Sequence, residues 1–305
     1  MRLAIRYATR FLYAGPVWQS HNALRACPVE DARQRVVDYR VTTTPPSRVY
    51  SYVDYWGTRV DAFGIRPPHP RLEVVADAVV ETEAPALPPW ASASPEDAAP
   101  KGGVPRAALA APDFARAHLE YLDPSPHTRW DAELRRHAEE WIAPAGDDAI
   151  DVIVALYRAV GATLRYAPGA TTVGVDVNAV LREGAGVCQD FAHLLIALSR
   201  SVGVPARYVS GYLLAKDGGR ADDEPPGGVV EVTTHAWVEV AVPGCGWVPL
   251  DPTNQQPVGT RHVKIGHGRD YDDVLPLRGV YSGGPEHQLD VVVRMRELQT
   301  SSQQQ

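Results

Sequence analysis

The chain has little of three things that would point to particular classes of protein: cysteine, positive charge and long apolar runs. Its 305 residues include three cysteines, which lie far apart and cannot all pair, so the sequence implies no disulfide framework. A formal net charge of −7 argues against nucleic acid or an anionic membrane as the main partner, since both attract a positive surface. No apolar stretch is long enough to span a bilayer, and the N-terminus lacks the apolar core of a signal peptide. We therefore expect a cytoplasmic protein with reduced cysteines.

The sequence also lacks the glycine-rich phosphate loops of nucleotide-binding proteins and any compact zinc-binding spacing, so we expect neither a cofactor nor a metal. Five histidines and aspartates near the C-terminus are interpreted as solvated polar residues: His262, His267, Asp270, Asp272 and Asp273.

The composition and length allow two globular domains, with 45% hydrophobic and 22% charged residues. Short segments rich in β-branched and aromatic residues recur from residue 2 to residue 82, and residues 54–58 are typical of a hairpin turn. Their even spacing predicts an antiparallel, β-sandwich-like domain over residues 1–83.

Residues 84–112 are rich in proline and alanine, which is typical of a linker or of a segment wrapped over a surface. A second domain is expected over residues 113–305. It begins with apolar stripes at helical spacing in residues 130–141 and 150–164, the latter with Asp147 or Asp148 as its N-cap, and continues with strands. The predicted fold class is therefore α+β.

Cys188 lies where a glycine-rich turn, GAGVCQDF at 184–191, enters an amphipathic helix that ends near Gly203 and Pro205. The thiolate is the reactive form of cysteine, and a helix N-terminus directs a positive dipole and free N–H groups at it. The N–H of Cys188 is then a candidate oxyanion donor. The alternative is a buried structural cysteine.

His235 and Asp251 lie in two short strand patterns, THAWVEV at 234–240 and GWVPLDPT at 246–253, joined by a hairpin. In each strand the apolar core residues alternate with His235 or Asp251. Both of these side chains should therefore lie on the face of the sheet opposite the core. A four-residue loop would put them on opposite faces, so we expect an odd-length loop or a β-bulge. Alternatively, Asp251 only forms a turn before Pro252.

A thiol, an imidazole and a carboxylate are the groups needed for covalent acyl transfer. His235 would take the Cys188 proton, hold the thiolate as an ion pair and then protonate the leaving amine, while Asp251 fixes the tautomer of the ring. Three further residues are open to two interpretations each. Gln189 lines the oxyanion pocket or caps the helix, Trp237 walls an acyl pocket or packs, and Tyr166 contacts substrate or packs within its loop.

Four motifs together resemble the core of the bacterial transglutaminase-like superfamily: GVCQDF at 186–191, PARYVSGY at 205–212, HAWVE at 235–239 and WVPLDPT at 247–253. The likeness continues through GRDYDDV at 268–274, and the strands near residues 7–13 with PPH at 67–69 are similar to the N-terminal β-domain of such proteins. The resemblance implies a papain-like α+β catalytic domain with Cys188, His235 and Asp251 as its triad.

The family includes amine-transferring cross-linking enzymes, peptidases, amidases and inactive copies. The resemblance thus implies thiol attack on a peptide or side-chain amide and an acyl-enzyme resolved by water or an amine acceptor. The alternative is a non-catalytic peptide-binding module with the same cleft. The animal enzymes are calcium-dependent and much longer, so no calcium site is carried over. Relatives are often encoded beside an ATP-grasp ligase-like protein, which implies a functional link.

Overall fold

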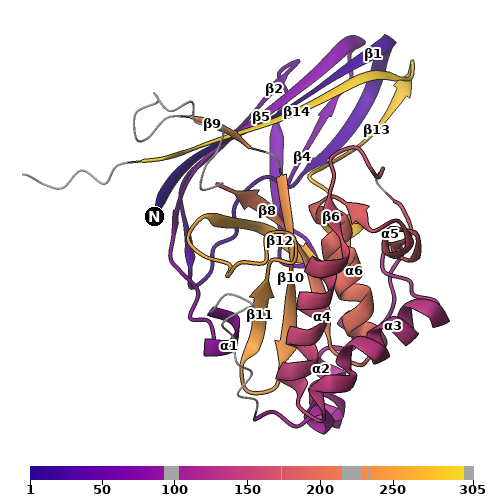
Figure 1. The fold of residues 1–305 in the computed structure, drawn as a ribbon. Helices are drawn as coiled ribbons and strands as arrows, with labels where there is room; N and C mark the ends of the chain where they lie inside the picture. Colours follow the sequence, from indigo (N-terminus) through magenta and orange to yellow (C-terminus); the bar gives the residue numbers. More distant parts are fainter. Residues whose placement is uncertain (93–102, 173, 215–228, 233, 299–305) are drawn as a thin grey trace, which may run out of the picture.

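The computed structural model describes residues 1–92, 103–172, 174–214, 229–232 and 234–298. Figure 1 shows a tall sheet that contains both the first and the last strands of the chain, above a smaller sheet with helices along it. Within the described residues, no helix is both long and apolar enough to cross a membrane.

The tall sheet is built around one long strand, β1 (Arg2–Leu24), and all its pairs are antiparallel, as the sequence predicts. The first half of β1 lies between β5 (His69–Thr82) and β14 (Glu286–Glu297), and its second half between β4 (Arg59–Ile65) and β13 (Leu277–Gly283). The outer strands are β2 (Gln34–Thr44) beside β5, β3 (Val49–Val53) beside β4, and β9 (Val230–Val232) beside β14. Alternate side chains from both halves of β1 pack into one core, so the two halves of the sheet share an interior.

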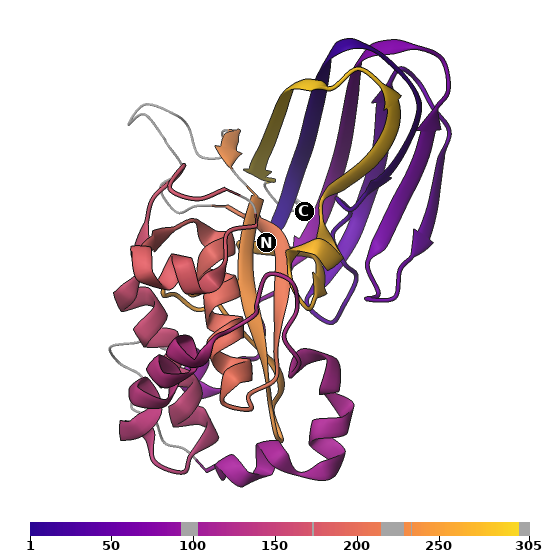
Figure 2. The same ribbon diagram turned by 90° about the vertical axis from the view of Figure 1, so that its right-hand side faces the viewer.

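The last strands of the chain depart from the expected division at residue 113. Strands β13 and β14, which fall within the expected catalytic segment, pair with β1 over residues 277–297 and complete the N-terminal sheet instead (Figure 2). The local sequence of these strands does not show which distant strand they join.

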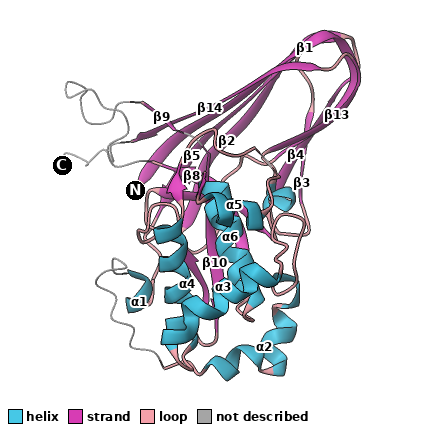
Figure 3. Cartoon of the chain, turned by 45° about the vertical axis from the view of Figure 1, so that its right-hand side comes forward, coloured by secondary structure: helices cyan, strands magenta, loops and turns pink. Residues whose placement is uncertain are grey.

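The smaller unit is a four-stranded sheet in the order β11-β10-β8-β12, with most of its helices packed on one face and the α2 region lying below the sheet (Figure 3). Its strands are β8 (Ala206–Leu213), β10 (Thr234–Val242), β11 (Gly246–Leu250) and β12 (His262–Gly268). The α-helices are α2 (Pro112–Ala117), α3 (Ala132–Ile142), α4 (Ala149–Thr163), α5 (Val177–Glu183) and α6 (Cys188–Ser201). The short elements are the parallel pair β6 (Arg165–Tyr166) and β7 (Ala185–Gly186), and 3-10 turns η2 (Leu119–Tyr121), η3 (Ala143–Ala145) and η4 (Tyr271–Val274).

Helix α6 is the centre of this unit, because every side chain from Asp190 to Ser201 is buried. It packs against β10 and β8 on one side and α4 on the other. Helix α4 begins at Asp148, whose carboxylate accepts the N–H groups of Ile150 and Asp151, so Asp148 rather than Asp147 is its N-cap.

The described parts of the segment 84–112 are packed onto the helical unit. Trp90 in α1 (Pro89–Ser92) and Leu109 in η1 (Arg106–Ala110) are buried in its core. This is the surface-wrap alternative of the sequence analysis.

The two units also share apolar packing. Tyr212 and Leu214 of the β8 region, with Val263 and Ile265 of β12, are buried in the same cluster as the core of the tall sheet. The ring of Tyr212 lies 6.4 Å from that of Tyr7 in β1, measured between ring centroids. The mixed α+β architecture, an antiparallel sheet followed by a helix-covered core, is the predicted fold class.

Candidate active site

Cys188 is the first residue of α6, as the sequence predicts, and its side chain is half-buried. The chain enters α6 through Gly184, whose φ of +64° is left-handed and suits glycine. Gly186 has a different role: a Cβ there would lie 2.7 Å from the Asp190 side chain. The Asp190 carboxylate accepts the N–H of Val187 at 2.8 Å and thereby fixes the turn that carries Cys188.

His235 and Asp251 leave their strands on the same face because the hairpin loop has an odd length. The loop is residues 243–245, with Val242 paired to Gly246 and Val238 paired to Leu250. Continuing this register by one residue places Asp251 on the face of His235 and Trp237. The odd-length loop expected from the apolar pattern is confirmed.

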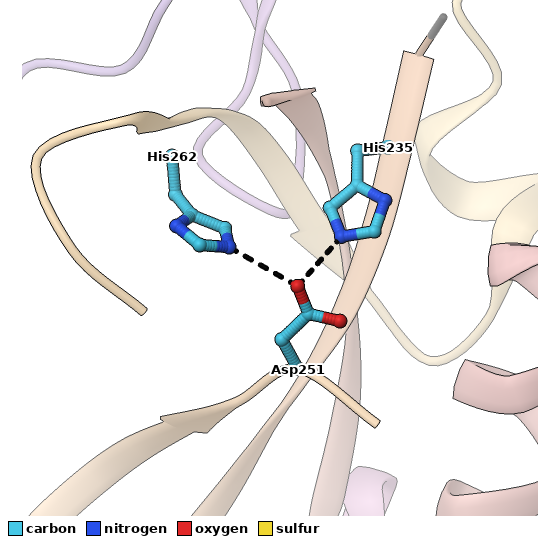
Figure 4. A group of neighbouring side chains, drawn as sticks. All are labelled: His235, Asp251 and His262. Carbon is cyan, nitrogen blue, oxygen red and sulfur yellow. Dashed lines mark hydrogen bonds and ion pairs between the residues drawn. The ribbon is translucent and has the colours of Figure 1, made fainter. Parts of the chain in front are cut away.

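Figure 4 shows the carboxylate of Asp251 between the rings of His235 and His262. Its Oδ2 accepts a hydrogen bond from His235 Nε2 at 2.9 Å, and its Oδ1 accepts the backbone N–H groups of Thr253 and Asn254. The main-chain carbonyl of Asp251 accepts the hydroxyl of Tyr157 in α4 at 3.0 Å. The carboxylate is therefore held by its own turn, while α4 holds its backbone.

The environment favours a charged His235 beside a charged Asp251. Burial acts to lower the pKa of His235, but hydrogen bonds to Asp251 and Cys188 and the attraction of both groups outweigh it and raise the pKa to about 10. Burial acts to raise the pKa of Asp251, but hydrogen bonds from His235 and His262 hold it well below its usual range. Since Nε2 of His235 is bonded to Asp251, Nδ1 is the nitrogen left for the Cys188 thiol.

His262 is a site residue that the sequence analysis missed. It was expected to be solvated, but its side chain is buried and its Nε2 lies 3.2 Å from Asp251 Oδ2. Asn254, two residues beyond Pro252, also donates its Nδ2 to the same oxygen at 2.8 Å. A histidine at the start of a strand gave no signal of its own, because its partner lies 11 residues away on the far side of a loop.

The neighbouring aspartates are likewise not simply solvated. Asp270 is buried and accepts the N–H of His127, while Asp273 pairs with Arg269 at 2.9 Å. Asp272 is exposed and lies 3.0 Å from the ring of His127. These contacts hold η4 against the loop before α3.

His267 of the same group is half-buried on β12. Burial, with Arg207 and Lys264 nearby, lowers its pKa to about 3. His267 was expected to be solvated, and the structure corrects this, because its side chain is partly buried.

Three further candidates lie around the triad in different settings. Trp237 is fully buried, and its ring lies edge-on to His262 with centroids 5.5 Å apart, so it packs beside the triad, and a role as an acyl-pocket wall stays a prediction. Tyr166 is 49% exposed and lies beside the Cys188 turn, because β6 pairs with β7. Gln189 is half-buried on the first turn of α6. Roles for Tyr166 and Gln189 toward substrate stay predictions.

Comparison with known proteins agrees with this architecture. Residues 135–252 match the transglutaminase-like superfamily, and residues 3–81 match the bacterial transglutaminase-like N-terminal region. An uncharacterized protein of Mycobacterium leprae is 36% identical over 297 residues, covering 97% of this chain and 99% of that protein. A protein-glutamine gamma-glutamyltransferase of Pseudomonas aeruginosa is 30% identical over 145 residues, covering 43% of this chain and 21% of that protein.

The fold is also found in a solved structure. A candidate cysteine protease from Cytophaga hutchinsonii superposes with a TM-score of 0.70 at 20% identity, covering 99% of this chain and 92% of that one. Both parts of the chain thus share the fold of that solved structure. The chain belongs to the transglutaminase-like superfamily, with the bacterial type of N-terminal region.

Proposed function

We propose that the chain is a thiol enzyme acting on a peptide or side-chain amide, with Cys188 as nucleophile, His235 as base and acid, and Asp251 as the group that orients His235. The observation that carries this is the His235 ring, which is hydrogen-bonded through Nε2 to a buried carboxylate and whose pKa is raised by that carboxylate and by the nearby Cys188.

The chemistry follows from these positions. The Cys188 proton moves to His235 Nδ1, and the thiolate forms a bond to the amide carbonyl carbon as its C–O double bond opens. The Cys188 N–H at the start of α6 is placed to donate to the resulting oxyanion. The oxyanion then collapses, the C–N bond breaks, and the imidazolium gives its proton to the leaving amine. A thioester on Cys188 remains, and it is released by water or by an amine.

The acceptor in the second step is water or an amine. Only the named relative from Pseudomonas aeruginosa, a protein-glutamine gamma-glutamyltransferase, favours the amine, and it is similar over less than half of this chain. We therefore propose a peptide or protein amide as the donor substrate and leave the acceptor to experiment. A reduced, cytoplasmic location and a functional link to an ATP-grasp ligase-like protein are part of the same proposal.

The first test is the reactivity of the three thiols toward iodoacetamide, followed by mass spectrometry of the labelled peptides. We expect Cys188 to react at least about tenfold faster than the exposed Cys245 at pH 6, because only Cys188 has an imidazolium partner. Cys27 should be slowest, since burial raises its pKa to about 12. His235→Asn should remove the advantage of Cys188.

The second test identifies the reaction. A peptide library is incubated with wild type, Cys188→Ala and the matched control Cys245→Ala, with and without an added primary amine. Amide hydrolysis or amine incorporation that is lost only in Cys188→Ala would support the proposal. An unreactive Cys188 in the native protein, with no product from any peptide, would favour the binding-module alternative.

A further inference from the structure

His262 reaches the triad across an intervening strand. It begins β12, and β8 lies between β12 and β10, the strand of His235. At the crossing point β8 carries Gly211, which pairs with His235 on one side and Lys264 on the other. A Cβ on Gly211 would lie 2.6 Å from the Trp237 ring. The absent side chain therefore lets Trp237 lie over β8, with His262 packed against its edge.

The hydrogen bonds of His262 define its tautomer. Its Nδ1 lies 3.2 Å from the N–H of Gly259, so Nδ1 accepts and Nε2 carries the hydrogen that is donated to Asp251 Oδ2. The pKa of His262 is lowered, because burial lowers it most and nearby His235 and Arg33 lower it further. The hydrogen bond and charge of Asp251 act in the opposite direction but do not outweigh these effects. His262 is thus a neutral donor at neutral pH.

The carboxylate of Asp251 does not need His262 for its orientation. Oδ1 is fixed by two backbone N–H groups of its own turn, and Oδ2 is bonded to Asn254 as well as to His235. What His262 adds is one more donor on the oxygen that His235 uses. Each donor stabilises the ionised carboxylate and leaves less of its charge to stabilise the His235 imidazolium.

We infer that His262 is a positioning residue that shares Asp251 Oδ2 with His235 and so limits how tightly His235 holds its proton. The inference rests on the proposed function, in which His235 must give that proton to the leaving amine. The groups that face His235 in this arrangement are Asp251, Cys188 and His262, and Tyr157 and Arg33 lie behind Asp251 and His262. Without His262, the imidazolium should be held more tightly and protonate the amine more slowly.

The test is a titration of the His235 ring by NMR, with histidine labelled with ¹³C at Cε1, in wild type, His262→Leu and His262→Gln. In His262→Leu the His235 ring should titrate at a pH higher than in wild type by about 1 unit, part of the effect of one hydrogen bond to a charged group, because Asp251 Oδ2 loses one donor. His262→Gln, whose amide can still donate, should titrate like wild type. An unchanged or lower value in His262→Leu, or an equal shift in both variants, would overturn the inference.

Two measurements keep the outcome clear. If His262→Leu does not fold, ¹⁵N spectra of wild type decide: a neutral Nε2–H tautomer of His262 from pH 6 to 9 is expected, and a charged ring or the Nδ1–H tautomer would overturn the inference. Iodoacetamide labelling separates this result from the proposed function. Slow labelling of Cys188 in wild type would contradict the proposed function. Fast labelling of Cys188, together with no change in the His235 titration in His262→Leu, would contradict only the role of His262.

Discussion

At the scale of single residues, the site depends on the charge of Asp251. Both of its oxygens accept hydrogen bonds, and the carboxylate is fully buried. A buried carboxylate that is so thoroughly bonded stays ionised, and it stabilises the imidazolium of His235 more than the neutral ring.

We expect Asp251→Asn to lower the pKa of His235 toward or below its ordinary value, because burial would then act without the opposing charge. The rate of Cys188 alkylation at pH 6 should fall by roughly tenfold or more. The measurement is the rate of Cys188 alkylation at pH values from 4 to 10. The matched control is Asp272→Asn, at an exposed position outside the site. A profile for Asp251→Asn that overlays wild type would contradict this.

The raised pKa of His235 also predicts how stability depends on pH. Since its folded-state value, about 10, is above the ordinary 6.5, its contribution to folding is complete below about pH 6.5 and is lost as the pH rises through 10. The free energies of unfolding of wild type and His235→Gln, measured in urea, should therefore differ most near pH 6.5. The difference should shrink by a few kcal/mol, in order of magnitude, between pH 6.5 and 10. A constant difference would show that His235 does not titrate in this range.

At the scale of elements, the face of the small sheet that carries His235 and Trp237 also contains a largely buried ion-pair network that spans three strands. Glu239 in β10 accepts Lys264 of β12 at 2.7 Å and Arg207 of β8 at 2.6 Å, and the Arg207 guanidinium lies 4.0 Å from the ring centre of Trp247 in β11. Burial acts to raise the pKa of Glu239, but the two cations outweigh it and lower the pKa to about 2.

We expect Glu239→Gln to lower the free energy of unfolding by about 3 to 5 kcal/mol, because the buried Lys264 and the half-buried Arg207 lose their charged partner. Glu81→Gln, which removes an exposed pair with Arg35, should cost less than about 1 kcal/mol. Urea denaturation at pH 7 measures both variants. Equal effects would mean that the buried network contributes no more than a surface pair.

Helix α4 contacts the loop that follows Asp251 at Gly161, against which the Gln255 side chain packs. A Cβ on Gly161 would overlap the side chain of Gln255, which donates to the main-chain oxygens of Tyr157 and Pro252. Gly→Ala inside a helix ordinarily stabilises it by about 1 kcal/mol. Here we expect Gly161→Ala to slow Cys188 alkylation severalfold by displacing the loop, and Gln255→Ala in the same chain to restore the rate. No change in Gly161→Ala would show that the loop adapts freely.

The elements differ in how far they could be predicted from the sequence. The start of α6, the Asp148 cap and the odd hairpin loop follow from local patterns, since capping residues and alternation act within a few positions. His262 and the pairing of β13 and β14 with β1 could not be predicted. They depend on contacts between segments far apart in the chain, and alternation shows which face a residue occupies but not which strand lies beside it.

At the scale of the whole molecule, the two units are joined by more than a linker. Residues 277–297 belong to the N-terminal sheet, and apolar side chains of β8 and β12 lie in its core. The division at residue 113 therefore separates strands that pair.

We expect a chain of residues 113–305 to aggregate or remain partly unfolded, because β13 and β14 would lose β1 and side chains such as Tyr212 and Val263 would be exposed. Size-exclusion chromatography and circular dichroism of this fragment beside the full chain are the measurements. A monomeric fragment that melts cooperatively would show that the helical unit folds alone.

The position of β1 between β5 and β14 has a consequence for biosynthesis. Leu3 pairs with Val80 on one side and with Glu297 on the other, so one edge of β1 finds its partner early in translation, whereas the other edge stays open until β14 has been synthesised. An open strand edge invites pairing with other chains. This edge of β1 is therefore exposed to such pairing from the synthesis of β1 until the synthesis of β14.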